Sequence, residues 1–206
     1  MGKPRFQRRK EDRPAEITAA ALDAFAEKGF DATRVEEVAQ RAGVSKGLLY
    51  LYFKTKEDLF KAVIRSFVSP RIDALIENIE TTDQSAEAFL RGPFLQFARQ
   101  VPKSPVRVLV RLMVAEGPKH PDLVAWYWDN VVSRAMHALR TLMRRAVDAG
   151  EFRESAVNEF PQLLVTPVLF STLWTQVFKR QSDLDTDRFI EAHLDLLLEA
   201  IGRSET

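Results

Sequence analysis

The amino-acid sequence predicts an all-α protein, with a three-helix helix-turn-helix domain at the N-terminus and a helical bundle after it. Apolar residues recur at helical spacing along nearly the whole chain, which indicates amphipathic helices. Alternating strand patterns with hairpin turns are missing. Capping residues and glycines separate short helices in the first third of the chain, and we expect about nine helices in total.

The first two helices are marked by glycines and by a capping pattern. The first is predicted over residues 14–28, and Gly29 suits the position that follows a helix C-terminus. Thr33 is a favourable N-cap for the second helix, and Glu36 three residues later completes a capping-box pattern. Gly43 ends this second helix after about two turns.

The third and fourth helices also begin at capping residues. Ser45 is the predicted N-cap of the third helix, which extends to about Phe53. Thr55 and Asp58 form a second capping-box pattern. The helix that follows begins at residue 56 and is expected to continue to about residue 80, with Pro70 bending or breaking it.

The rest of the chain is predicted to form a helical bundle. Gly92-Pro93 interrupts an apolar pattern, so we expect a kink there. The longest uninterrupted pattern covers residues 121–150, and two further helices are predicted at about 157–179 and 187–202.

These patterns divide the chain into three parts. We expect a basic N-terminal tail at residues 1–12, a helix-turn-helix domain at 13–65 with its motif at about 34–53, and a second helical domain at 66–206. Residues 1–65 hold fourteen Lys/Arg and ten Asp/Glu, a net charge of +4, whereas the remainder has a net charge of −3. This asymmetry favours a polyanion as the partner of the N-terminal part. The alternative is a solvated tail with no partner.

Other classes of protein find little support in the sequence. There are no cysteines, no apolar run long enough for a membrane span, and no secretory signal, so we expect a cytoplasmic protein. The three histidines, His120, His137 and His193, are far apart, and there is no nucleophile–base pair, phosphate-binding loop or HExxH motif. We therefore expect no catalysis, no metal and no cofactor.

The stretch that carries chemistry is the pair of short helices joined at "AGVS". Ala39 is small enough for a close helix crossing, and Gly43 tolerates the backbone conformation of the turn. Val38, Val44 and Leu49 are expected to hold the two helices together. In a helix-turn-helix the second helix lies in the major groove of DNA, and its N-terminal residues face the bases.

The segment "TRVEEVAQRAGVSKGLLYLYFKTKEDLF" resembles the TetR/AcrR family of bacterial transcriptional regulators. The resemblance covers roughly residues 13–65. We expect Arg34 and Leu51 to contact DNA, and Leu51 is a candidate for contact with a thymine methyl group. The resemblance implies DNA contacts for seven other residues: Thr33, Ser45, Lys46, Gly47, Tyr50, Tyr52 and Lys56. Arg5 to Lys10 are expected to reach phosphates or the minor groove beside this helix.

The resemblance also implies a second domain that dimerises and binds a small molecule. The segment "FPQLLVTPVLFSTLWTQVF" is apolar nearly all round, so it is either buried or part of an interface. We expect a homodimer through the helices at 157–179 and 187–202; the alternative is an intramolecular core. A two-fold dimer would bind a pseudo-palindromic operator in double-stranded DNA.

The evidence for a ligand pocket is weaker, because aromatic residues and methionines also build ordinary cores. Eight residues are candidates for the lining of an apolar cavity: Phe89, Phe94, Phe97, Met113, Trp126, Met136, Phe170 and Trp174. The sequence thus predicts a regulator, expected to be a repressor that a small and mainly apolar effector releases from its operator. The alternative is a DNA-binding protein without control by a small molecule.

Overall fold

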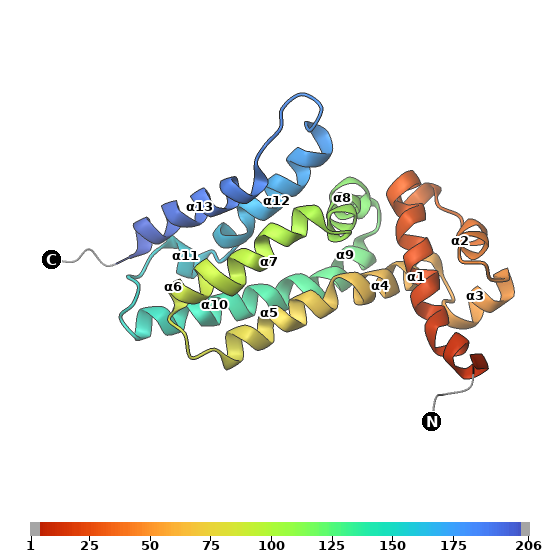
Figure 1. Ribbon diagram of the computed structural model, residues 1–206, viewed down its shortest axis with the longest axis horizontal. Helices are drawn as coiled ribbons and strands as arrows, with labels where there is room; N and C mark the ends of the chain where they lie inside the picture. Colours follow the sequence, from red (N-terminus) through yellow and green to blue (C-terminus); the bar gives the residue numbers. More distant parts are fainter. Residues whose placement is uncertain (1–4, 203–206) are drawn as a thin grey trace. The chain divides into compact units, whose positions relative to one another are not determined.

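The computed structural model describes the backbone of residues 5–202 and the side chains of residues 13–202. The regular structure in this range is helical, which confirms the all-α class (Figure 1). The described residues form two compact units. The first unit extends to Pro70 and also includes Leu112–Tyr127, and the second unit comprises Arg71–Arg111 and the chain from Trp128 onward.

The first unit is built on three phenylalanines. Phe25, Phe30 and Phe60 are buried, and their ring centroids lie 5.2–5.6 Å apart. Such tilted and edge-on ring pairs add to the stability gained from burial. The helices of this unit are α1 (Arg5–Ala32), α2 (Val35–Arg41), α3 (Lys46–Tyr52), α4 (Lys56–Phe67), α9 (Pro121–Tyr127) and the last residues of α8 (Val106–Glu116).

The first helix is longer than predicted. It begins at Arg5 and extends to Ala32, although Gly29 interrupts it with φ +84° and ψ 174°. The backbone of most of the predicted tail is therefore helical from Arg5 onward. The side chains of Arg5 to Lys10 lie outside the described residues, so their contact with DNA stays a prediction.

The capping predictions have mixed outcomes. Ser45 caps α3, and Thr55 and Asp58 form the complete capping box of α4, as predicted. The capping box at Thr33 is wrong, because the N-cap of α2 is Arg34 and no side chain caps it. The hydroxyl of Thr33 instead donates to the backbone carbonyls of Gly29 (2.6 Å) and Ala24 (3.2 Å) of the preceding helix.

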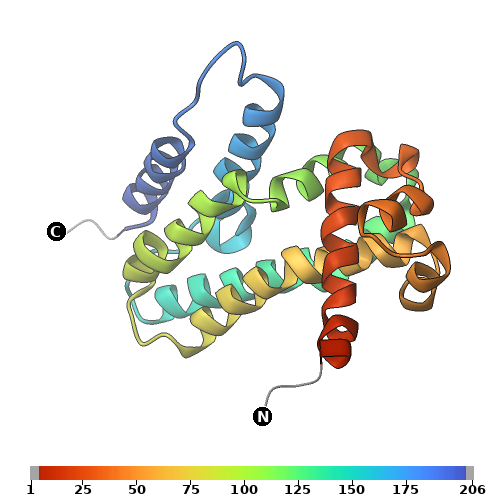
Figure 2. The same cartoon turned by 45° about the vertical axis from the view of Figure 1, so that its right-hand side comes forward.

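The second unit contains the remaining helices, which Figures 1 and 2 show as a bundle with α12 and α13 side by side. The kink predicted at Gly92-Pro93 is confirmed, because a π-helical turn occupies Leu90–Phe94. Its helices are α5 (Ser69–Thr81), α6 (Ala86–Phe89), α7 (Leu95–Gln100), the first residues of α8, α10 (Ser133–Asp148), α11 (Ala156–Glu159), α12 (Gln162–Val177) and α13 (Thr186–Ile201).

The helix predicted over 121–150 is interrupted. A second π-helical turn at Trp128–Val132 separates α9 from α10, and the units divide at this turn. Gly150 has φ +74°, so it ends α10 in the backbone conformation that glycine adopts most easily. Among the described residues, no helix combines the length and hydropathy that a bilayer span requires.

Candidate nucleic-acid interface

The geometry of the helix-turn-helix motif follows from a few small and apolar residues. Gly43 takes φ +64° between α2 and α3, a conformation that costs an L-residue with a side chain more than it costs glycine. The N–H of Val44 donates to the carbonyl of Ala39 at 2.9 Å and closes the turn. Val38, Ala39 and Leu49 are buried, and α2 packs against both α1 and α3.

One side of α3 remains exposed after this packing. Ser45, Lys46 and Gly47 are exposed. Leu49 points into the core and is buried, whereas 71% of the surface of Leu51 is accessible. Space is open around Gly47, because a Cβ built there meets no atom within 4 Å. We call Arg34, Ser45, Lys46, Gly47 and Leu51 the contact face.

Tyr50 and Tyr52 lie at the edge of the contact face and are half-buried. Tyr52 packs against Phe53, with ring centroids 6.3 Å apart, and Phe53 is buried. The ammonium of Lys46 lies 5.8 Å from the centroid of the Tyr50 ring. Contact of these tyrosines with DNA stays a prediction.

Two members of the predicted contact set form bonds within the first unit. Thr33 is only 2% exposed and its hydroxyl is bonded inside the unit; its contact with DNA stays a prediction. Lys56 donates from Nζ to the carbonyls of Phe30 (2.8 Å) and Asp31 (2.9 Å). Its ammonium also lies 4.6 Å from the centroid of the Phe30 ring, so it stabilises the end of α1.

A carboxylate lies among the cations of the contact face. Nζ of Lys46 is 2.5 Å from Oε1 of Glu36, and this ion pair joins α3 to α2. The hydrogen bond from Lys46 is the main cause of a lowered pKa at Glu36, and the nearby charge of Arg34 contributes in the same direction. Sequence reasoning used Glu36 only as a capping residue and missed this pair.

A second group of charges joins α2 to α1, away from the contact face. The guanidinium of Arg41 donates to Glu27 at 2.8 Å and 2.5 Å and to Glu37 at 2.8 Å, and Lys28 lies 2.7 Å from Glu37. Glu36 lies in the first turn of the same helix, and Arg34 is its N-cap.

The first unit also receives contacts from the end of α8 and the turn after it. The carboxylate of Glu116 accepts hydrogen bonds from the N–H groups of Phe30 (3.0 Å) and Asp31 (2.7 Å). Nε2 of His120 lies 2.7 Å from Asp31, and the ammonium of Lys119 lies 3.3 Å from it. The contact with His120 is the main cause of a lowered pKa at Asp31.

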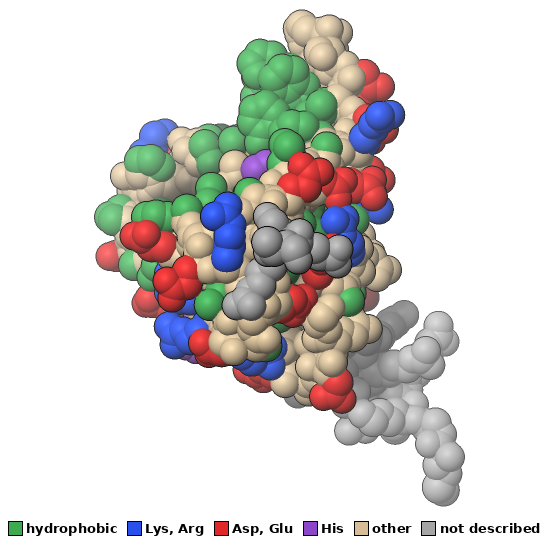
Figure 3. Space-filling view, turned by 90° about the vertical axis from the view of Figure 1, so that its left-hand side faces the viewer, with side chains coloured by type: hydrophobic (Ala, Val, Ile, Leu, Met, Phe, Trp, Pro, Cys, Tyr) green, Lys and Arg blue, Asp and Glu red, His purple; other side chains and the backbone are tan. Residues whose placement is uncertain are grey.

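An apolar surface occupies α12, the turn after it, and α13. Leu169, Phe170, Val177, Phe178 and Leu196, which we call the apolar face, are between 43% and 66% exposed. Hydrophobic side chains gather in the upper part of Figure 3, on the side of the molecule that carries these helices. Exposed apolar surface of this kind is typical of an interface between proteins.

The predicted ligand-pocket residues divide between the two units. Phe89 and Phe94 are buried in the core of the second unit, whereas Met113 and Trp126 belong to the first unit. The cations of Lys61 and Arg65 lie 5.8 Å and 5.0 Å from the centroid of the Trp126 ring.

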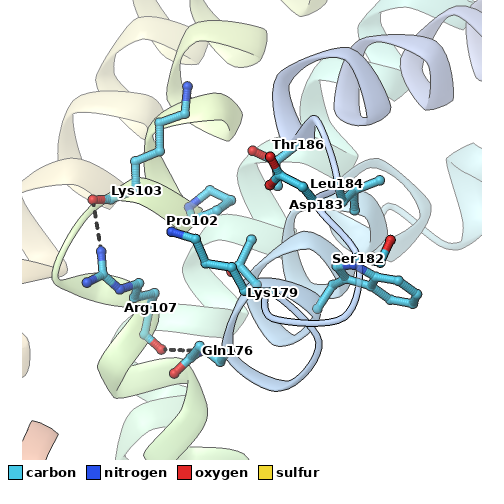
Figure 4. A pocket seen from close by; sticks show the side chains of 11 residues that line it. Pro102, Lys103, Arg107, Gln176, Lys179, Ser182, Asp183, Leu184 and Thr186 are labelled. Carbon is cyan, nitrogen blue, oxygen red and sulfur yellow. Dashed lines mark hydrogen bonds between the residues drawn. The ribbon is translucent and has the colours of Figure 1, made fainter.

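Two of the predicted residues line separate cavities. Trp174 lines a cavity of about 390 Å³ between the start of α8 and the loop after α12, where the side chain of Lys179 points toward Pro102 (Figure 4). Met136 lines a groove of about 760 Å³ along α5 and α10. One apolar cavity shared by the eight predicted residues therefore stays a prediction.

Both parts of the chain match models of one family. Residues 17–63 match the model described as bacterial regulatory proteins of the tetR family, and residues 84–197 match the tetracyclin repressor-like C-terminal domain. The first match contains the whole helix-turn-helix motif, and the second alone covers more than half of the chain.

Individual proteins agree with these matches. The uncharacterized transcriptional regulator YfiR of Bacillus subtilis is 37% identical over 78 residues, which are 38% of this chain and 35% of YfiR. The chain therefore spans about a third of the length of that relative. The fatty acid metabolism regulator protein of Bacillus subtilis is 22% identical over 194 residues, 93% of this chain and 98% of that protein.

A solved structure has the same fold. The complex of triclosan with SmeT, the repressor of the Stenotrophomonas maltophilia multidrug efflux pump SmeDEF, superimposes with a TM-score of 0.76 at 21% identity. The superposition covers 94% of this chain and 93% of SmeT. From the two family matches, the chain belongs to the TetR family of bacterial regulatory proteins and is a DNA-binding transcriptional regulator.

Proposed function

We propose that this chain is a repressor that binds a pseudo-palindromic operator as a homodimer and leaves it when a small, mainly apolar molecule binds. The observation that carries the DNA-binding part is the contact face. Its residues are exposed, and neither Gly47 nor Leu51 has a packing role in the first unit. A helix-turn-helix with such a face inserts its second helix into the major groove.

The proposed contacts divide into two kinds. Lys46 is suited to a guanine edge or a phosphate, and Leu51 to a thymine methyl group. Arg34 and the hydroxyls of Ser45, Tyr50 and Tyr52 are suited to phosphates, which fix the position of the helix on the duplex but carry no sequence information. The side chains of Arg5 to Lys10 are proposed to add phosphate or minor-groove contacts.

The proposed dimer forms through α12 and α13. The apolar face supports this assignment, because its five side chains are large, apolar and poorly covered within one chain. A two-fold dimer places its two recognition helices one turn of DNA apart, about 34–36 Å, or a multiple of that distance. The operator is then expected to be a pseudo-palindrome.

The effector is proposed from the relatives. One relative is named a fatty acid metabolism regulator, and SmeT has been solved with triclosan, so both names point to apolar molecules. A ligand shifts the equilibrium between DNA-binding and released forms only by its difference in affinity for the two. A regulator of this kind acts on DNA in the cytoplasm, and no catalytic role is proposed.

In vitro selection from random-sequence duplexes with the full-length protein tests the DNA-binding part. The expected result is enrichment of one pseudo-palindrome with half-sites about 34–36 Å apart. Failure to enrich any sequence, with a folded and dimeric protein, would contradict the proposal.

The effector part needs its own experiment. Triclosan and stearate are added to the protein, and both the thermal midpoint and the operator affinity are measured. A rise in the midpoint together with a loss of operator affinity supports control by a ligand. A rise in the midpoint with unchanged operator affinity favours the alternative, a DNA-binding protein without such control.

A further inference from the structure

The cations predicted to contact DNA are not equally available in the DNA-free protein. The ammonium of Lys56 is bonded to two carbonyls at the end of α1. The ammonium of Lys46 is paired with Glu36. Arg34 is exposed two residues before Glu36 and contributes to the lowered pKa of that carboxyl group. One carboxylate, that of Glu36, thus neutralises much of the positive charge of the contact face.

The stability of the fold does not explain this ion pair. The side chains of Lys46 and Glu36 are 58% and 52% exposed. Ion pairs with this exposure contribute little to folding, because water screens them and because two flexible side chains must be ordered. The pair lowers the pKa of Glu36 and raises the pKa of Lys46, so each group favours the charged form of the other.

The position of the pair points to DNA instead. Non-specific binding to DNA depends almost entirely on contacts between cations and phosphates. A carboxylate on this face is repelled by phosphates, and the pair must break before Lys46 can bind DNA. In an operator complex we expect the bond to Glu36 to be replaced by a bond to a base edge, whereas random DNA offers Lys46 only phosphates, for which the ion pair with Glu36 competes.

We propose that Glu36 is a specificity-determining residue that holds Lys46 in an ion pair and thereby weakens binding to non-operator DNA. This inference rests on the proposed operator binding through α3. Glu36 acts through Lys46 and through its own negative charge, and it needs no bond to DNA. Its role is to increase the ratio of operator affinity to non-specific affinity.

The test is Glu36→Gln in the full-length protein, measured by fluorescence anisotropy. One probe is the duplex selected in vitro as operator, and the other is a scrambled duplex of the same length and composition. The salt dependence of binding is followed for each. We expect the slope for scrambled DNA to become steeper by about one, because one more phosphate contact forms. Such a slope corresponds to about eightfold tighter binding at 0.1 M salt than without the contact.

Operator affinity is expected to change by less than about threefold, because Lys46 has already left Glu36 in that complex. The ratio of the two affinities therefore falls. Glu16→Gln is the matched control, since Glu16 forms an exposed ion pair with Arg13 on α1, at 3.3 Å, and its loss changes the net charge equally. This control should leave the ratio unchanged.

A double variant separates the two ways in which Glu36 acts. In a Lys46→Gln background, Glu36→Gln should lose most of its effect on scrambled DNA. The proposal is overturned if Glu36→Gln strengthens binding to both duplexes equally, leaves scrambled-DNA binding unchanged, or weakens operator binding. If selection yields no operator, the proposed function fails, while the scrambled duplex still tests the effect of Glu36 on Lys46.

Discussion

The carboxylate of Glu116 accepts a hydrogen bond from the backbone N–H of Asp31 at 2.7 Å, and from that of Phe30 at 3.0 Å. Both N–H groups follow Gly29, where the helical hydrogen-bond pattern is broken, so the carboxylate provides the acceptor that the helix does not. The end of α8 thereby becomes part of the DNA-binding unit, although it lies far from that unit in sequence.

Gly29→Ala and Glu116→Ala should destabilise the first unit in a coupled way. Gly29 has φ and ψ values that are nearly restricted to glycine, at a cost of about 1–3 kcal/mol for other residues. A Cβ there would lie 2.4 Å from Oε1 of Glu116, so the carboxylate would also have to leave its hydrogen bonds. Glu116→Ala loses the same bonds, at a cost of about 2 kcal/mol.

Because both variants lose these bonds, the double variant should be less destabilised than the sum by about 2 kcal/mol. Urea unfolding of the four proteins measures this difference. Additive effects would show that the carboxylate moves aside without losing its bonds.

Gly47→Ala should have opposite effects on stability and on DNA binding. The site is helical and open, so alanine is expected to stabilise α3 by up to about 1 kcal/mol. If the DNA backbone approaches this position closely, the added methyl group should weaken operator binding by about tenfold or more, a loss of about 1.4 kcal/mol. Thermal unfolding and anisotropy measure the two effects. Unchanged operator affinity would place Gly47 away from the DNA.

Leu51→Ala should weaken binding at one A·T position of the operator. The side chain is 71% exposed, so its truncation should leave the fold intact. Loss of contact with a thymine methyl group is expected to cost about 1 kcal/mol at that position only. Competition with single-base operator variants measures the pattern. A uniform loss across all variants would argue against this contact.

Local signals in the sequence predicted the motif well. Ser45, Thr55 and Gly43 act on backbone groups within a few residues, so their spacing alone identifies the helix starts and the turn. Thr33 was misread because its hydroxyl bonds to carbonyls of the preceding helix, and a capping pattern does not distinguish these two uses. Within one short segment, the capping pattern is therefore right for Ser45 and Thr55 and wrong for Thr33.

Long-range contacts could not be predicted in the same way. Glu116 and its partner Phe30 are 86 positions apart, and nothing in the pattern around either residue indicates the other. Phe89, Phe94 and Trp174 show a related difficulty, since large apolar residues fill cores and line cavities with the same periodicity. For these residues only the three-dimensional arrangement separates the two uses.

Val177→Arg should dissociate the proposed dimer. Val177 is 62% exposed at the end of α12, and a charge buried there against the second copy would lack a partner. Val114→Arg is the matched control, because Val114 is 59% exposed but lies on α8 in the first unit. Sedimentation should show a loss of dimer affinity of at least about 100-fold, or about 2.7 kcal/mol, for the first variant only. Equal dimer affinities for the two variants would contradict the proposal that the apolar face is the dimer interface.

Tyr127→Phe should remove one source of instability at alkaline pH. Burial raises the pKa of Tyr127 to about 12, from an ordinary value of 10.0. Between pH 10 and about pH 12 the phenol ionises in the unfolded chain but stays protonated in the folded protein, so the free energy of unfolding falls as pH rises.

The loss should reach about 1.4 kcal/mol at pH 11 relative to pH 9 in the protein with Tyr127, and be missing from the variant. Lysines and arginines also titrate in this range, but they contribute equally to both proteins and cancel in the difference. Urea unfolding of the two proteins between pH 9 and pH 11 measures the difference in their free energies of unfolding. A difference in stability that stays constant over this range would mean that the phenol ionises as readily in the folded protein as in the unfolded chain.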